Sequence, residues 1–343
     1  MAAESRSGVA AEKPRRGVGG VIRRITRSRE SGIAIPLVLL IVIISVVNPV
    51  FLNIDNLLNV ARQISFTFII GIAMTYVLLA AGIDLSVGSV LALGGVICGL
   101  ALRGLMVHQP LWIAIGTGIV VGTAMGILTG VFNGLVITRF RIPPLIVTLG
   151  MMYMARGVVQ VLTRGNPVYP FPDEFNNLGQ GYLFGVPNVV YVAAVLGVLA
   201  HVVLTKTAFG RAVFAVGGNM ETARLSGINV RKILVYVYVI CGVASALTGV
   251  LTASRLASAL SNAGTGMELQ VIAACIIGGT SMFGGAGSIL GSLIGASFMS
   301  IIANGMVLMK ISVYFQAVVI GAIIILAVGM DQFRRSRGGM TGG

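Results

Sequence analysis

Long apolar runs separated by short polar segments dominate the chain and indicate helices that cross a membrane. The period-2 alternation that is typical of membrane barrel strands is absent. The pattern therefore predicts an all-α polytopic membrane protein with about ten transmembrane helices. The predicted spans are 33–50, 66–81, 88–103, 112–137, 144–163, 188–206, 233–252, 268–282, 288–308 and 313–330.

The polar segment 207–232 is unusually rich in charge and glycine for this chain. Within it the pattern predicts a short helix from Asn219 to Gly227. Asn219 can cap its first turn, Glu221 suits the positive end and Arg224 the negative end, and Gly227 can adopt the left-handed exit conformation. Such a helix can contact a partner outside the membrane, although an ordinary solvated loop fits the same local pattern.

Composition supports the membrane assignment. Hydrophobic residues make up 56% of the 343 positions and charged residues only 10%, whereas soluble domains carry about a quarter charged residues. The 47 glycines suit close helix packing in lipid. The three cysteines lie in apolar stretches, where we expect them to pack rather than bind a metal: Cys98, Cys241 and Cys275.

The distribution of basic residues predicts the orientation. With the N-terminus inside, 18 of the 24 basic residues fall in the cytoplasm and 5 outside. Both termini are then cytoplasmic, and the net charge of +14 reflects membrane flanks rather than nucleic-acid binding. Residues 1–32 are interpreted as a basic tail, disordered over 1–19 with a possible interfacial helix at 20–30. Residues 33–333 form the transmembrane domain and 334–343 a second basic tail.

Two glycine-rich breaks interrupt the apolar pattern. They lie at 81–89 and 278–288, and the spans beside the first are predicted to be too short to cross fully. Paired breaks of this kind indicate a substrate pathway. Neither break contains the lysine of a phosphate-binding loop, and no nucleotide-binding motif occurs elsewhere. His108 and His201 are isolated in sequence and predict neither a metal site nor catalysis.

Three ionisable side chains fall within or beside the predicted spans, where charge is costly and therefore suggests function. Asp84 lies in the first break and can contact substrate or cap the next helix. Arg156 can pair with an acid or with backbone carbonyls, and Glu268 can act as an ordinary charge at the outer start of its span.

Small and polar residues near the breaks and in the spans are the candidate pathway. Hydrogen bonding between helices is the alternative for each of them. The candidates are Asp84, Ser86, Gly88, Ser89, Asn133, Asn262, Thr280, Ser281 and Asn304. The longest external loop, 164–187, is either a docking surface for an extracytoplasmic partner or a passive connector.

Four ordered segments resemble permease subunits of bacterial ABC sugar importers, the ribose, xylose, galactose and autoinducer-2 group that is related to branched-chain amino-acid permeases. The resemblance covers about residues 33–333. Its segments are AGIDLSVGSVLALGG (81–95), RIPPLIVTLGMMYMARG (141–157), TAFGRAVFAVGGNMETARLSGINVRK (207–232) and IIGGTSMFGGAGSILGSLIG (276–295).

The resemblance implies a type II ABC importer-like fold and a set of partners. It implies a second permease copy or a paralogue, two cytoplasmic ATPase subunits, a periplasmic or surface-tethered solute-binding protein, and the lipid of the bacterial inner membrane. It also identifies a coupling helix that seats in the ATPase, with Thr222 where alanine is common. Its residues here are Gly218, Asn219, Glu221, Ala223, Arg224, Leu225, Gly227 and Ile228.

These observations predict a transport subunit that is not itself an enzyme. It binds no cofactor, and ATP and Mg²⁺ are used by the partner ATPase. The predicted cargo is a monosaccharide or a similar small polar solute. An ion-coupled secondary transporter is the alternative, although such a carrier is expected to show more intramembrane carboxylates than this chain offers.

Overall fold

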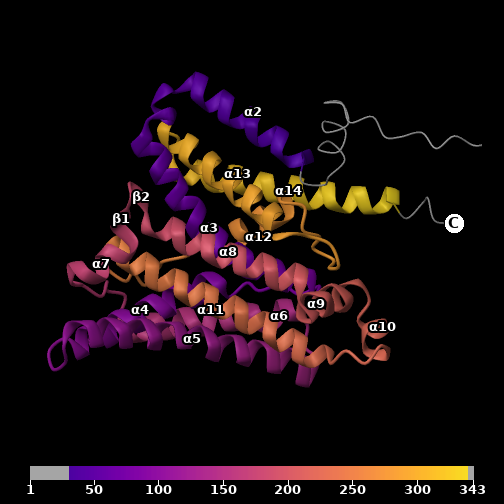
Figure 1. Cartoon of the computed structure of the whole chain (residues 1–343), viewed down its shortest axis with the longest axis horizontal. Coiled ribbons are helices and arrows are strands. Elements are labelled where there is room, and N and C mark those ends of the chain that lie inside the picture. The colour runs from indigo at the N-terminus through magenta and orange to yellow at the C-terminus, as the bar shows by residue number, and fades with distance from the viewer. Residues whose placement is uncertain (1–30, 339–343) are drawn as a thin grey trace, which may run out of the picture.

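The computed structural model describes residues 31–338, which fold almost entirely into helices (Figure 1). The predicted tail features at 1–19 and 20–30 lie outside the described residues. A two-stranded antiparallel hairpin, β1 (Tyr182–Leu183) and β2 (Val186–Pro187), is the only sheet within them. The helices are α2 (Ser31–Val47), η1 (Pro49–Leu52), α3 (Ile54–Leu79), α4 (Val87–Leu105), α5 (Leu111–Phe140), α6 (Pro144–Thr163), α7 (Asp173–Gln180), α8 (Asn188–Lys206), α9 (Ala208–Gly218), α10 (Met220–Leu225), α11 (Val230–Leu256), α12 (Met267–Ile277), α13 (Ile289–Leu308) and α14 (Val313–Gly338).

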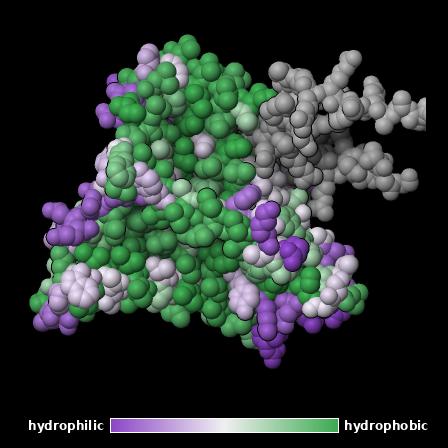
Figure 2. All heavy atoms as spheres, viewed as in Figure 1, coloured by the Kyte–Doolittle hydropathy of each residue, from purple (hydrophilic) through white to green (hydrophobic). Residues whose placement is uncertain are grey.

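The molecule has two polar ends separated by an apolar middle. Helix α7 and the hairpin lie at one end, and α9 and α10 at the other (Figure 1). We call these the α7 end and the α10 end. Hydrophilic residues gather at both ends, with a hydrophobic band between them (Figure 2). Among the described residues, seven helices are long and apolar enough to cross a membrane: α3, α4, α5, α6, α8, α11 and α13.

Each predicted span overlaps a helix. Three of those helices, α2, α12 and α14, show apolar stretches of only 10–17 residues within the part of the chain whose side chains the structure describes. The prediction that short spans flank the first break is wrong. Helix α3 has 26 residues and is longer than the predicted span. Its first turns contain polar residues, among them Asp55, Asn56 and Arg62, which are helical but lie outside the apolar run. The second break does adjoin a short helix, the 11-residue α12.

Helix α5 packs closely against α4 and α11 through a glycine on every fourth residue. These glycines are buried on one face: Gly118, Gly122, Gly126, Gly130 and Gly134. A Cβ added to Gly126 would lie 2.5 Å from the carbonyl carbon of Gly242 in α11, and one added to Gly134 would lie 2.7 Å from Val235 Cα. Glycine therefore sets the backbone spacing between the two helices, as expected for helix association in lipid.

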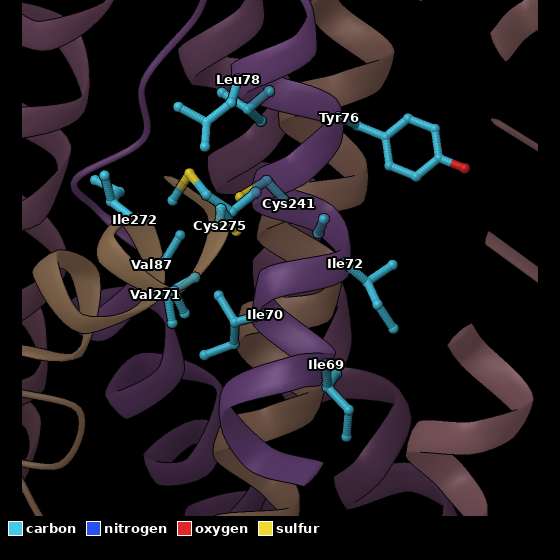
Figure 3. Packing of buried hydrophobic residues seen from close by; sticks show 14 of the residues in the cluster. Ile69, Ile70, Ile72, Tyr76, Leu78, Val87, Cys241, Val271, Ile272 and Cys275 are labelled. Carbon is cyan, nitrogen blue, oxygen red and sulfur yellow. The ribbon is translucent and has the colours of Figure 1, made fainter. Parts of the chain in front are cut away.

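Helix α3 is the centre of the hydrophobic core, and it is buried on all sides from Ser65 to Leu79. Cys241 and Cys275 lie among apolar side chains on one side of α3, whereas Tyr76 points away on another (Figure 3). The Tyr76 hydroxyl donates to Ala200 O of α8 at 2.6 Å. Thr75 Oγ1 lies 2.5 Å from Ser292 Oγ of α13. The predicted packing role of the cysteines is confirmed, because all three are buried with free thiols.

The spacing of α5 and α11 gives the first testable prediction. Gly126→Ala should lower the stability of the detergent-solubilised protein by about 1–3 kcal/mol, because the added methyl group forces the two backbones apart. The control is Gly116→Ala on the same helix, where an added Cβ has no neighbour within 4 Å. Apparent melting temperatures would show a drop for Gly126→Ala only, and equal values would contradict the packing account.

Candidate coupling and translocation sites

The predicted capped helix is present as α10. Asn219 Oδ1 accepts a hydrogen bond from Thr222 N at 2.9 Å, which caps the first turn. Gly227 has a φ of +82° just after the helix. Glu221 and Arg224 do not act separately on the two helix ends, since they pair with each other: Arg224 Nη2 lies 2.6 Å from Glu221 Oε1.

The surface of α10 is divided into an anchored side and an exposed side. Ala223 is 3% exposed and holds the helix against the protein, whereas Leu225 is 77% exposed. The hydrogen bond from Arg224 lowers the pKa of Glu221, so the carboxylate stays charged well below neutral pH. The helix therefore presents an apolar side chain and an ion pair to the surroundings at the α10 end.

Three segments far apart in sequence meet next to the connection between α9 and α10. They are the end of α3, the last residues of α9, and the second break. Gly285 N donates to Leu79 O at 3.0 Å. A Cβ added to Gly217 would overlap Leu79 O and lie 2.8 Å from Gly285 N. We call these contacts, formed by Leu79, Gly217 and Gly285, the glycine junction.

The first break holds a buried polar network. Asp84 Oδ1 accepts hydrogen bonds from Ser86 N at 2.9 Å and from Ser86 Oγ at 2.5 Å. Asn133 Nδ2 of α5 donates to Ser86 Oγ at 3.2 Å. The capping interpretation of Asp84 is correct in part: its carboxylate fixes the turn that enters α4, but Ser86 occupies the N-cap position itself.

A second non-helical segment, 257–266, runs from the α7 end into the helix array. Ala259 pairs with Val168 near the α7 end, with both backbone hydrogen bonds at 3.0 Å. Further along, Gly264 reaches the start of α4, where a Cβ added to Gly88 would overlap Gly264 O. The same Cβ would lie 2.5 Å from Glu268 Oε2, so the carboxylate lies against α4. The starts of α4 and α12 thus meet.

Arg156 binds this segment through its backbone. Its Nη1 donates to Ser261 O at 2.8 Å and to Ala263 O at 2.9 Å. This confirms the carbonyl alternative for Arg156. Arg156 and Glu268 form no direct ion pair, since the pair in α10 is the only one within 4 Å in the described part of the chain.

The structure brings Asp84, Ser86 and Asn133 together but does not gather all the predicted pathway residues into one site. The group of Asp84, Ser86 and Asn133 is buried, as is Ser89. Asn304 exchanges hydrogen bonds with Asn56 of α3, at 2.9 and 3.2 Å, which favours the helix-packing alternative for this residue.

The remaining candidates lie at the second break and around the 257–266 segment. Thr280 and Ser281 shape the second break, where Ser281 N donates to Ala286 O at 2.7 Å. Only Gly88 and Asn262 belong to the region around the 257–266 segment. Asn262 is exposed.

Sequence reasoning missed two elements near the sites. Helix α9 was not predicted, although Thr207 caps it by accepting from Gly210 N at 3.2 Å, and a Thr before an apolar run is a readable signal. Helix α7 was also not predicted inside the 164–187 loop, where Pro172 followed by two acidic residues marks a helix start. Whether this loop docks a partner stays a prediction.

The long apolar helices, the paired breaks and the exposed capped helix together define a multi-pass membrane permease. Residues 56–328 match the family described as the permease component of the branched-chain amino acid transport system. The chain therefore belongs to this permease family.

Several curated relatives match over nearly their whole length. A ribose import permease of Haemophilus influenzae is 40% identical over 87% of this chain and 92% of the relative. A D-allose transport permease of Escherichia coli is 37% identical over 82% and 85%. An L-arabinose ABC transporter permease of Azospirillum brasilense is 35% identical over 96% and 94%. No solved structure matches the chain. These relatives are transport subunits rather than enzymes, and so is this chain.

Proposed function

We propose that this chain is the permease subunit of an ATP-driven importer that moves a monosaccharide across the bacterial inner membrane. The names of its relatives support the cargo, since ribose, allose and arabinose are all neutral monosaccharides. The chain would work with a second permease copy or paralogue and with an extracytoplasmic solute-binding protein. ATP and Mg²⁺ would be bound by separate ATPase subunits.

The orientation follows from charge. The helices at the α10 end are flanked by basic residues such as Arg139, Arg141, Lys206 and Arg231, whereas the α7 end carries fewer. Basic residues favour the cytoplasmic side, which supports a cytoplasmic position for α10 and for both termini. In this proposal the chain crosses the membrane about ten times, because a helix lies at each of the ten predicted spans.

In this proposal α10 is the coupling helix. Its exposed side offers what a docking contact needs: Leu225 for apolar burial and the Glu221–Arg224 pair for electrostatic register. Caps at both ends make the helix a firm unit. Ile228 N donates to Ala223 O at 3.1 Å, which ties the exit of the helix to its anchored residue.

The observation that carries the proposal is the glycine junction. Helix α9 ends at Gly218 and α10 begins at Met220, so only one residue separates the two helices. A displacement of α10 therefore also moves Gly217. Gly217 contacts Leu79, which leads into the first break, and Gly285 of the second break. A motion that the ATPase imposes on α10 can therefore reach both breaks through backbone contacts alone.

An ion-coupled secondary transporter is the alternative. The test is uptake into proteoliposomes that contain the permease, its ATPase and its binding protein, with labelled D-ribose, D-allose and L-arabinose as probes. We expect uptake of one such sugar to require ATP and to cease when the ATPase is inactivated by mutation. Uptake driven by an ion gradient without ATP would support the alternative.

Charge changes on α10 should weaken ATPase binding. Glu221→Lys and Arg224→Glu are each expected to reduce co-purification with the ATPase roughly tenfold, because the electrostatic register with the partner is lost. Glu174→Lys, the same charge change on α7, is the control and should have no effect. Normal co-purification and uptake in both α10 variants would exclude α10 as the coupling helix.

The glycine junction yields a sharper prediction. Gly217→Ala should abolish ATP-driven uptake while the ATPase still binds, because the methyl group displaces α9 from Leu79 and Gly285. Gly116→Ala on α5 is the control, since an added Cβ there has no neighbour within 4 Å and the residue lies outside the coupling helix. Equal uptake by the two variants, at equal amounts in the membrane, would contradict transmission through the junction.

A further inference from the structure

A polar strip lies on the surface of the helix array, on α6 and the 257–266 segment. Tyr153, Arg156 and Gln160 share one face of α6, because residues three and four apart in a helix are neighbours. Tyr153 is 70% exposed and Gln160 is exposed. Arg156 joins this face to the segment through the carbonyls of Ser261 and Ala263.

The strip lies at hydrocarbon depth. Arg156 is the thirteenth residue of the 20-residue helix α6, one of the seven helices able to cross a membrane. At 1.5 Å per residue it lies about 18 Å from one end of the helix and about 10 Å from the other. A charged group at this depth is costly against lipid and is found where it meets water or a polar partner.

A carboxylate accompanies the guanidinium. Glu268 is partly exposed, and its Oε2 lies beside Gly88 at the contact with Gly264, the residue after the Ala263 carbonyl that Arg156 binds. The two side chains form no direct ion pair. Within the described residues the guanidinium donates hydrogen bonds only from Nη1. Donors of Arg156 and acceptors of Glu268 therefore remain available to a third molecule, and the two opposite charges leave the site close to neutral.

We propose that Arg156 and Glu268 form the contact site for the sugar inside the membrane, on a face of the permease that lines the translocation pathway. This assignment rests on the proposed import function. Neighbouring hydroxyl groups of a neutral monosaccharide can accept from a guanidinium and donate to a carboxylate. The ring of Tyr153, one turn away on α6, offers an apolar surface to the C–H face of the sugar.

The site differs from the polar network around Asp84. In that network the carboxylate is 1% exposed and is already bonded to Ser86. Its acceptors are used to shape the chain, whereas those of Glu268 are free to meet cargo. Gly88 adjoins the proposed site because its lack of a side chain makes room for the Glu268 carboxylate.

Transport kinetics in proteoliposomes test the proposal, with whichever of D-ribose, D-allose and L-arabinose the wild type imports. Glu268→Gln should lower uptake by roughly tenfold to hundredfold, the loss expected for a charged hydrogen-bond partner. ATPase binding and basal ATP hydrolysis should not change. Arg156→Lys, which keeps the charge and a donor for the carbonyls, should have an intermediate effect. Asp55→Asn at the start of α3, outside the 164–187 loop, is the control.

Wild-type uptake by Glu268→Gln would overturn the site while leaving the importer assignment intact. Conversely, wild-type uptake that does not depend on the ATPase would refute the importer assignment itself. The two failures are therefore distinguishable in one set of measurements.

The accessibility of the site to water gives an independent test that does not depend on uptake rates. Tyr153→Cys should react with a charged, membrane-impermeant thiol reagent in the assembled transporter. Val158→Cys, which is 47% exposed on another face of α6, should not react. The native cysteines are buried and give little background. No reaction at position 153, or equal reaction at both positions, would show that this face is not the pathway.

Discussion

Direct contact between backbones is the constraint on which this structure depends. Between α5 and α11 it sets the spacing of the helix array, and at the glycine junction it joins α9 to α3 and the second break. Lipid provides no hydrophobic driving force between helices, so close approach and the packing it permits supply much of the cohesion. Because backbone atoms touch directly at these contacts, a displacement of α10 moves the neighbouring helices and is not taken up by rearrangement of side chains.

Polar groups in the apolar region fall into two kinds. Some complete the fold: Asn56 and Asn304 bind each other, and Asp84 organises the turn into α4. Others keep unused hydrogen-bonding capacity on the surface of the array, as Arg156 and Glu268 do. The two kinds differ in whether their hydrogen-bonding groups already have partners. Residues with partners hold the helices together, and residues without them can bind a passing solute.

The sequence predicted the elements with local signals and missed those that depend on three-dimensional contacts. Asn219 and Gly227 mark α10 because capping needs only neighbouring residues, and that helix is confirmed. The glycine junction was unpredictable, since nothing local relates Leu79 to Gly217 or Gly285. Residue type alone predicts the pathway candidates, and it cannot distinguish Asn304, whose hydrogen bonds are satisfied, from the partly exposed Glu268. The apolar pattern predicts too short a helix at α3, because the first turns of this helix carry polar residues and lie outside the apolar run.

The most direct test of transmission through the junction is the ATP dependence of thiol labelling at Ala81, an exposed residue of the first break. Ala81→Cys would be labelled in the assembled transporter, with and without ATP, in the wild-type background and together with Gly217→Ala. The account predicts a labelling rate that changes with ATP in the first case and does not change in the second. The same ATP-dependent change in both backgrounds would contradict it.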